Sequence, residues 1–386
     1  MRPPNVLSFT KIPQNVCCCE IHENIRACVK ALKKSGPLFH FLNSDYNIHK
    51  NFTCDQPTIK CFDNKCANCC SSKHLKSVVE KLENPSQLVT WFKWVKTSKS
   101  DNQDRQTNVY CNVEKVEKSG HLHELLDETI SLVPHFLEHQ YVKLNQSNAN
   151  KRMIERALKL NSEHAVIVCD FAENFKCLQQ NSTQSAHYGQ TPVTLFTVAV
   201  YHRKLLPLTI ASNCEKHTKD SIFAYLDKLL QFLPDTVKIV DFWSDNATSQ
   251  FKNQYNLEAM KKFEFRYPSF QIKWNFYAPM HGKSVVDGIG GSVKRFVRSR
   301  IVAQNLIVKS AEDFVSIAKE MDIKVILMKN SDIEQCNIEL GLKQIVKDSK
   351  KIQEIKKKHF FSVETLTVGK KNSGKIVGLR ITPNAA

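Results

Sequence analysis

The sequence predicts an α/β protein in which a mixed sheet carries helices on both faces. Three observations lead to this prediction. The run HAVIVCDFA (164–172) has almost no polar residue, as is typical of a strand that is covered on both faces. Two further apolar runs follow it as a hairpin-like pair around Arg203 and Lys204. Beyond residue 219, helical and strand-like patterns alternate, which favours helices packed against a sheet.

Cysteine usage separates an N-terminal module from the rest of the chain. Of the 14 cysteines, nine lie between Cys17 and Cys70. We therefore expect a Cys/His-rich module in residues 1–75. The patterns SSKHLKSVVEKL and HLHELLDETISLVPHFLEHQYVKLNQ indicate a mainly helical region over residues 76–160.

The predicted sheet domain covers residues 161–325. After the first strand, VTLFTVAVYHR and LPLTIAS supply two more strands, and KDSIFAYLDKLLQFL has the apolar spacing of an amphipathic helix. A strand (TVKIVDFWSD), a helix (SQFKNQYNLEAMKKF), a strand (FQIKWNFYA) and a helix (SVKRFVRSRIV) complete the alternation. The last segment, 326–386, is predicted to be a basic C-terminal segment, and the alternative interpretation of its lysines at 350–358 is a solvated helix face.

The bulk composition points to an anionic partner. The chain has 386 residues, of which 42% are hydrophobic and 24% charged, and its net charge is +17. Because a cationic surface gains affinity by releasing counterions from a phosphate backbone, we expect DNA as a partner. The first residues lack the apolar core of a secretory signal, and no run approaches the roughly 18 apolar residues of a membrane span. We therefore expect no membrane contact, a nuclear location, and cysteines that are free or bound to metal.

Three aspartates stand where a cation site can form. Asp170 and Asp245 close apolar strand-like runs, and Asp287 opens the glycine-rich stretch DGIGG before a basic helix. Strand ends on a rigid sheet can hold carboxylates close enough to share two Mg²⁺ or Mn²⁺ ions, about 3.5–4 Å apart. Such a pair of ions neutralises the oxygens of a phosphodiester during transfer to water or to a 3′ hydroxyl. One strand-end aspartate is most often a turn former, but three in these places favour a catalytic site.

Two other acidic residues compete for these places. Glu173 lies three residues after Asp170 and could act behind the metal ligands. Asp241 shares a strand face with Asp245 through the two-residue period of a strand, so a shift in register would exchange them. The Ser-Asp-Asn sequence at the strand end favours Asp245.

The order of strands, helices and acids resembles the ribonuclease H-like fold of the DDE/D transposases and integrases. The separations of 75 residues (170 to 245) and 42 residues (245 to 287) suit that family. The strings DFAENF, QSAHYG, SDNATSQFKN, WNFYAPMHGK and DGIGGSVKR are similar to a widespread group of animal proteins derived from transposable elements, over roughly residues 163–300. The resemblance implies that Asp170 bridges both metal ions, while Asp245 and Asp287 each complete one site. Proofreading exonucleases of the same fold show Asp-x-Glu on the first strand, whereas this chain has Asp-x-x-Glu.

The placement of Asp287 depends on how the DGIGG stretch folds. A regular helix over 286–300 would have a core face made of Val286, Ile289, Val293 and Phe296. Asp287 would then lie on another side of the helix, with Lys294 and Arg298. The three glycines of the stretch (288, 290 and 291) favour an irregular first turn instead, because each costs about 1 kcal/mol inside a helix. Such a turn serves either close approach of a phosphate or tight packing.

Further side chains are candidates for substrate contacts. His281 and Lys283 directly precede the third aspartate, so His281 could position water and Lys283 could hold a phosphate. His187, in QSAHYG, is a candidate for the same cleft. A single histidine is more often structural than catalytic, so these residues form a second tier. The same tier includes Glu173, Lys294 and Arg298.

The cysteine module has the composition of a structural zinc site. A thiolate set with spacings of six, four and two residues can surround one tetrahedral Zn²⁺. The predicted ligands are Cys54, Cys61, Cys66 and Cys69. Cys70 competes with Cys69 for the fourth place. Cys19 and His22, beside two more cysteines at 17 and 18, either form a second zinc site or complete the first. Buried apolar thiols are the alternative, but the surrounding sequence is polar.

These observations leave three functions to weigh. The first is metal-dependent DNA strand transfer or nuclease activity by a transposase-like protein, active or domesticated. The second is a catalytically inactive DNA- or chromatin-binding protein, and the third is a zinc-stabilised interaction scaffold. The three aspartates favour the first function over the second, and the basic composition disfavours the third. A homo-oligomer is compatible with each of them.

Overall fold

The computed structural model describes residues 19–43, 47–69, 75, 77–78, 80–82, 84–99, 110–177, 192–215, 217–278, 285–348, 352, 354–368 and 371–379. They fall into two compact units, one extending to Leu144 and the other running from Asn145 to Ile381. Each unit has its own hydrophobic core. No helix in these ranges is long and apolar enough to cross a membrane.

The N-terminal unit begins with one long helix and three short ones. Helix α1 (Glu20–Ser35) buries one side, with Ile25, Val29 and Leu32 in the core of the unit. The elements η1 (Pro37–Phe39), η2 (Ile48–Asn51) and α2 (Ile59–Phe62) follow it.

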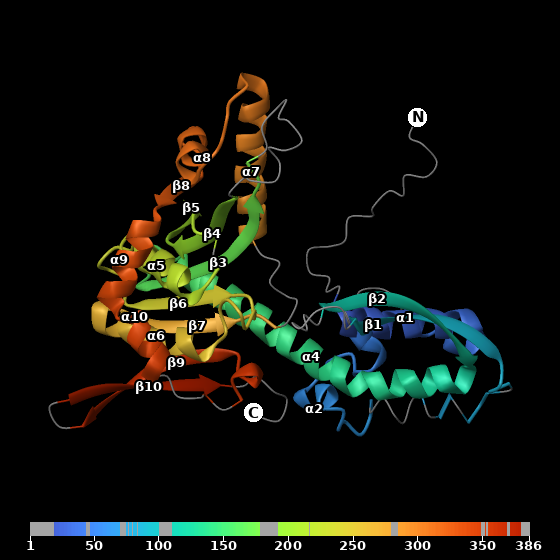
Figure 1. The fold of residues 1–386 in the computed structure, drawn as a ribbon. Coiled ribbons are helices and arrows are strands. Elements are labelled where there is room, and N and C mark those ends of the chain that lie inside the picture. The colour runs from blue at the N-terminus through green and yellow to red at the C-terminus, as the bar shows by residue number, and fades with distance from the viewer. Residues whose placement is uncertain are drawn as a thin grey trace. The chain divides into compact units, whose positions relative to one another are not determined.

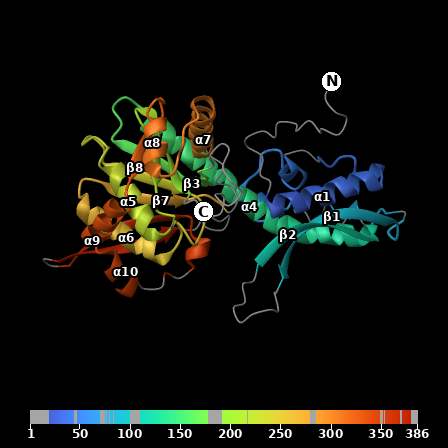
Figure 2. The same cartoon turned by 45° about the horizontal axis from the view of Figure 1, so that its top comes forward.

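A hairpin and the first part of a long helix complete the N-terminal unit. Strands β1 (Leu88–Lys99) and β2 (Tyr110–His121) pair antiparallel, and α4 (Leu122–Ala157) begins directly after them. Figure 2 shows α1 and the hairpin alongside the first part of α4. Trp91 of β1 and Phe136 of α4 belong to the same core as α1, so the three elements are held together by apolar burial.

This hairpin corrects the expectation of a mainly helical region over residues 76–160. The expectation is right for Leu122–Ala157 and wrong for Leu88–Lys99 and Tyr110–His121, where Leu88 pairs with His121 and Lys99 with Tyr110. The physical reason is the two-residue alternation of β1, which turns Trp91 towards α4. The indole of Trp91 is 5% exposed and its Nε1 donates to Glu128 Oε2 at 3.1 Å. Lys93 and Lys118 form ion pairs with the same carboxylate.

The C-terminal unit is built on an eight-stranded mixed sheet, with the order β10-β9-β7-β6-β3-β4-β5-β8 (Figure 1). At its centre, β3 (His164–Phe175), β4 (Val193–His202) and β5 (Lys204–Ser212) pair antiparallel. β6 (Ile239–Ser244) lies parallel to β3, and β7 (Gln271–Phe276) lies parallel to β6. The predicted mixed sheet is therefore confirmed.

Three strands of the basic C-terminal part of the chain, β8, β9 and β10, join this sheet. β8 (Lys324–Met328) pairs parallel with β5, so the boundary expected at residue 325 falls inside a strand. β9 (Phe360–Val368) pairs antiparallel with β7, and β10 (Lys371–Leu379) with β9. Burial of Phe361 in the main core explains why the lysine content of this segment is a poor guide to its fold. Of the lysine-rich stretch at 350–358, the described residues include the short η4 (Ile355–Lys357).

Helices cover both faces of the sheet, as expected. On one face the helices are α5 (Lys219–Leu230), α6 (Gln254–Arg266), α9 (Asn330–Leu340) and α10 (Leu342–Asp348). On the other face they are α7 (Val285–Gln304), α8 (Ala311–Ala318) and the last turns of α4. Successive side chains of β3 alternate between the two cores: Ile167 and Cys169 meet the first group, and Val166 and Val168 meet α7.

Candidate functional site

Asp170 and Asp245 lie at the same end of two neighbouring strands. β3 and β6 are parallel, with Val168 opposite Trp243. Continuing this register by two residues places Asp170 opposite Asp245, the first residue after β6. Since side chains two residues apart share a face of a strand, both carboxylates lie on the face of Val168 and Trp243.

Helix α7 covers this face and brings the third aspartate to it. Val286 and Ile289 of α7 share one buried cluster with Val168 and Trp243. Asp287 lies in the first turn of α7, next to Val286, and is exposed. The three predicted aspartates therefore gather at one end of one face of the sheet.

Gly290 allows α7 to approach the sheet closely at this point. A Cβ added to Gly290 would lie 3.0 Å from Ala172 Cβ on β3 and 3.0 Å from Thr197 Cγ2 on β4. A Cβ added to Gly288 would meet nothing within 4 Å. The expected irregular first turn is wrong, because α7 is helical from Val285 onwards. The tight packing of the helix, and not a break in it, explains the glycine at 290.

The regular helix has the core face that its periodicity predicts, with one change. Val286, Ile289 and Val293 are buried, as expected. Val297 is buried too, whereas Phe296 is only partly buried against the same core. An α-helix has 3.6 residues per turn. Three turns after Val286, the core position therefore falls at Val297 and not at Phe296.

Besides burial, the charges of Asp245 and Asp287 both act on the pKa of Asp170. Burial, together with the carboxylates of Asp245 and Asp287, raises the pKa of Asp170 to about 7, against the lowering effect of the Phe171 N–H. That N–H donates to Asp170 Oδ1 at 2.8 Å. Burial also raises the pKa of Asp245, against a hydrogen bond from the Ala247 N–H. A site of this kind gains stability when a cation neutralises it.

The three carboxylates are nonetheless wider apart than a closed metal cage. In the described ranges, two sets of side chains have ligand atoms that all lie within 4.8 Å of one another, and both contain cysteine. The aspartates are not one of these sets. The interaction that the structure shows between them is therefore the repulsion between their charges at Asp170.

Asp241, the competitor of Asp245, has a structural role. It is 2% exposed, and its Oδ2 lies 2.5 Å from Nε2 of His164. Its Oδ1 accepts from Asn275 Nδ2 at 3.0 Å. Both carboxylate oxygens are thus used in a buried contact between three strands, which leaves Asp245 at the strand end for other partners.

The second-tier residues divide into two groups. Lys294 of α7 donates to the Glu173 carbonyl at 3.2 Å and lies 3.7 Å from its carboxylate. The Glu173 side chain is 82% exposed, so its ion pair with Lys294 lies at the protein surface. Arg298 is exposed, with its guanidinium 5.7 Å above the Phe175 ring. The predictions for His187, His281 and Lys283 lie outside the described residues.

Four cysteines of the N-terminal unit form a candidate metal centre. The sulfur atoms of Cys54, Cys61, Cys66 and Cys69 all lie within 4.8 Å of one another. Cys54 Sγ and Cys66 Sγ are 3.8 Å apart, which matches the edge of about 3.8 Å in a tetrahedron with Zn–S bonds of about 2.3 Å.

Within this set, the surroundings lower the thiol pKa of Cys61 and Cys66 and raise that of Cys54 and Cys69. The backbone N–H of Thr58 donates to Cys61 Sγ at 3.4 Å. Burial of Cys61 acts against ionisation, but hydrogen bonds from the Thr58 side chain and backbone outweigh it and lower the thiol pKa to about 6. The four cysteines can therefore hold a metal ion such as zinc. Cys70, the competitor of Cys69, lies outside the described residues.

Cys19 and His22 do not complete this set. They meet His139 of α4, and the three ligand atoms lie within 4.8 Å of one another. The sequence prediction did not include His139, because 120 residues separate it from Cys19. The signal that was available is its position on the apolar side of a long helical pattern, next to the buried Gln140.

Comparison with known families agrees with the division into two units. Residues 146–370, more than half of the chain, match the family model described as Domain of unknown function (DUF8701). The chain belongs to the DUF8701 family. Residues 20–121 match a second model, Domain of unknown function (DUF8700). No curated protein and no solved structure matches the chain.

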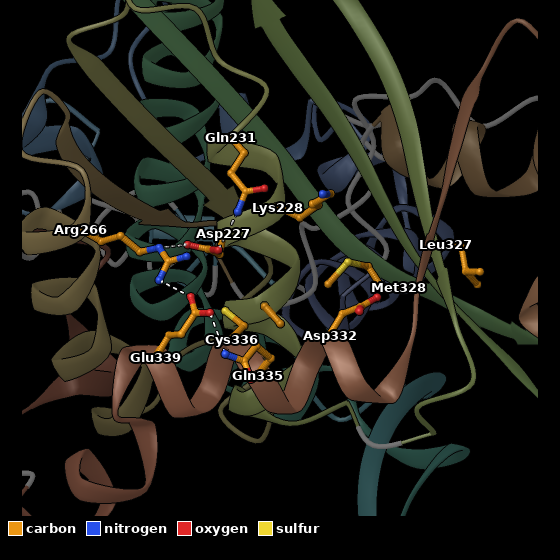
Figure 3. A pocket seen from close by; sticks show the side chains of 11 residues that line it. Asp227, Lys228, Gln231, Arg266, Leu327, Met328, Asp332, Gln335, Cys336 and Glu339 are labelled. Carbon is orange, nitrogen blue, oxygen red and sulfur yellow. Dashed lines mark hydrogen bonds and ion pairs between the residues drawn. The ribbon is translucent and has the colours of Figure 1, made fainter.

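The DUF8701 domain also has a surface pocket of about 370 Å³ between α5 and α9 (Figure 3). Arg266 lies in its wall, where its Nε is 3.0 Å from Asp227 Oδ1 and its Nη1 donates to Glu339 Oε2 at 2.8 Å. Gln231 donates to Asp227 Oδ2 at 3.0 Å. Because these polar groups bind one another, their contacts hold α5, α6 and α9 together. The pocket lies on the sheet face opposite the aspartates.

Proposed function

We propose that the DUF8701 domain catalyses metal-dependent cleavage or strand transfer of DNA, as a transposase-like DDE/D domain. The observation that carries the proposal is the coupling of three carboxylates, from two adjacent strand ends and one helix, at Asp170. Few structural roles need three acidic groups on one side of a sheet, because like charges repel one another. Phosphodiester chemistry through divalent cations does need them.

The topology supports this proposal. The first acid lies on β3, the first strand of the antiparallel meander β3–β4–β5, the second directly follows the parallel strand β6 beside it, and the third lies in the first turn of a helix that covers both. This is the arrangement that the resemblance to the ribonuclease H-like fold implies. Asp241 is buried and bound to His164 and Asn275, whereas Asp245 lies at the strand end. This difference supports Asp245, and not Asp241, as the second metal ligand.

The residues divide the work as follows. Asp170 would be the ligand shared by both ions, because the charges of both other aspartates act on it. Asp245 and Asp287 would each hold one ion. Bound Mg²⁺ or Mn²⁺ would supply charge neutralisation on the phosphodiester oxygens and activation of water or a 3′ hydroxyl. Metal binding would displace the proton that Asp170 holds near neutral pH, so affinity should rise above pH 7.

DNA is the proposed substrate. Arg298 is an exposed side chain of the helix that carries Asp287, and the chain has a net charge of +17. An exposed arginine on this helix can bind phosphates of the strand that holds the scissile one. Lys294 of the same helix is paired with Glu173 and would have to exchange that partner for a phosphate. Nuclear localisation and a structural Zn²⁺ in the four-cysteine centre are parts of the same proposal.

A nicking and strand-transfer assay with supercoiled plasmid tests the proposed activity. We expect cleavage with Mg²⁺ or Mn²⁺, loss of at least about 100-fold with Asp170→Asn or Asp245→Asn, and wild-type activity with the exposed control Asp235→Asn. Equal activity of all four proteins would show that the cleavage comes from elsewhere.

A DNA-binding protein without catalysis is the second candidate. The distance between the carboxylates, which are not all within 4.8 Å, favours it. It predicts plasmid binding that weakens steeply with salt in wild type and in Asp170→Asn alike, without cleavage in either. Salt-independent binding, or none, would leave the scaffold function.

A further inference from the structure

Three side chains from the two ends of the N-terminal unit's sequence meet in a second cluster. Cys19 precedes α1, His22 lies in its first turn, and His139 lies on α4. Cys19 Sγ is 3.2 Å from His22 Nδ1 and 3.4 Å from His139 Nε2. All three ligand atoms lie within 4.8 Å of one another.

We propose that Cys19, His22 and His139 bind a second Zn²⁺ ion, independent of the four-cysteine centre. One thiolate and two imidazoles are a ligand set that zinc prefers. In a tetrahedral site with Zn–S bonds of about 2.3 Å and Zn–N bonds of about 2.0–2.1 Å, sulfur and nitrogen are about 3.5 Å apart. The observed separations of 3.2 and 3.4 Å need only a small expansion.

Gln140 fixes the orientation of the His22 ring, on the side of the ring opposite Cys19. His22 Nε2 lies 2.8 Å from Oε1 of Gln140, and an amide oxygen can only accept. Nε2 therefore carries the proton, and Nδ1 turns its lone pair towards Cys19. A carbonyl oxygen on the remote nitrogen is the usual support of a zinc-bound histidine.

Burial of this cluster favours a bound ion over a solvated set of side chains. Cys19 is 4% exposed, His22 5% and Gln140 5%. The Phe136 ring packs edge-on against His22 at 5.1 Å, which covers the cluster from one side. In such a dry environment one cation that Cys19, His22 and His139 share would be held more strongly than by the same side chains in water.

The position of Cys19 also suits a thiolate. Cys19 is the N-cap of α1, a helix of 16 residues, and the free N–H groups and dipole of a helix N-terminus stabilise negative charge. Binding is written as Cys19–SH plus Zn²⁺ giving Cys19–S⁻–Zn²⁺ plus a released proton, while both histidines bind as neutral rings. The ion would tie the start of α1 to α4, across 120 residues of sequence.

The number of zinc ions per chain tests the proposal directly. Full-length wild type should hold two equivalents by mass spectrometry of the metal. His139→Gln should hold one, as should Cys66→Ser, which removes the other centre. The exposed His135→Gln, one turn earlier on α4, should keep two. A single equivalent in wild type, or two equivalents in His139→Gln, would overturn the proposal.

A ligand exchange guards against loss of metal through misfolding. His139→Cys keeps a zinc ligand at the same place, so it should retain two equivalents. In the Co²⁺-substituted protein its thiolate-to-cobalt absorption should exceed that of wild type, because one more thiolate joins the site. An absorption equal to that of wild type would show that residue 139 does not touch the metal.

Discussion

At Asp170, burial and two neighbouring carboxylates act in the same direction, and this has a consequence for stability. With a folded pKa of about 7 and an unfolded value of about 3.9, the folded protein holds a proton between these pH values that the unfolded chain releases. The free energy of unfolding contributed by this group therefore falls as the pH rises from about 4 to 7, and stays low above 7.

Asp170→Asn should remove this penalty. We expect the variant to be more stable than wild type at pH 8, by on the order of 1–2 kcal/mol, and equally stable near pH 4. Mn²⁺ should raise the melting temperature of wild type at pH 8 and leave that of the variant unchanged. Thermal melts at both pH values measure this. A variant that is less stable at pH 8 would contradict the placement of Asp170 beside two other charges.

The same substitution at Asp241 should have the opposite sign. Both oxygens of Asp241 bind buried partners, His164 and Asn275, and an amide would turn a donor towards one of them. We expect Asp241→Asn to lower the free energy of unfolding by about 2–4 kcal/mol. Urea denaturation gives the value, with the exposed Asp322→Asn as control. A loss below about 0.5 kcal/mol would remove the structural role assigned to Asp241.

At the scale of elements, two glycines of α7 offer a matched pair. Both Gly288→Ala and Gly290→Ala gain about 1 kcal/mol of helix propensity. Only the methyl group at 290 meets the sheet, at Ala172 and Thr197. We therefore expect Gly290→Ala to be at least about 1–2 kcal/mol less stable than Gly288→Ala, and to lose cleavage activity because the helix that carries Asp287 is displaced. Equal stability of the two variants would mean that α7 does not pack closely on the sheet.

The sequence predicts best those elements whose pattern leaves few alternatives. The unbroken apolar run of β3 fits either a covered strand or a buried helix, and its short length decides for the strand. The hairpin β1–β2 was missed because helical patterns precede and follow it, and its alternation buries one side only. The lysines after residue 325 concealed β9, whose burial depends on the neighbouring β7.

Contacts over long separations could not be predicted from local pattern. Asp245 was preferred to Asp241 because of the Ser-Asp-Asn sequence at the strand end, but the strand register that separates the two is decided by turns and pairing, and in the structure Asp241 is buried while Asp245 follows the strand end. His139 was missed because its partners are at the other end of the unit. Gly290 was noticed, but its reason, contact with two strands, requires the packed fold.

On the scale of the whole molecule, the two units should respond to different metals. All cysteine and histidine ligands proposed for zinc lie before residue 145, and the aspartates lie after it. Because each unit has its own core, we expect two calorimetric transitions. Chelation of zinc should lower one of them by roughly 10 °C or more and leave the other in place. A single transition that moves as a whole would contradict this independence.

The proposed cation site itself is tested most directly by diffraction from crystals soaked in Mn²⁺, recorded at the manganese absorption edge. We predict two anomalous peaks about 3.5–4 Å apart, with Asp170 bound to both ions and with Asp245 and Asp287 each bound to one. Asp170→Asn crystals should show neither peak. Ordered crystals of wild type without manganese at these carboxylates, or with manganese bound elsewhere, would contradict the assignment of the three aspartates to phosphodiester chemistry.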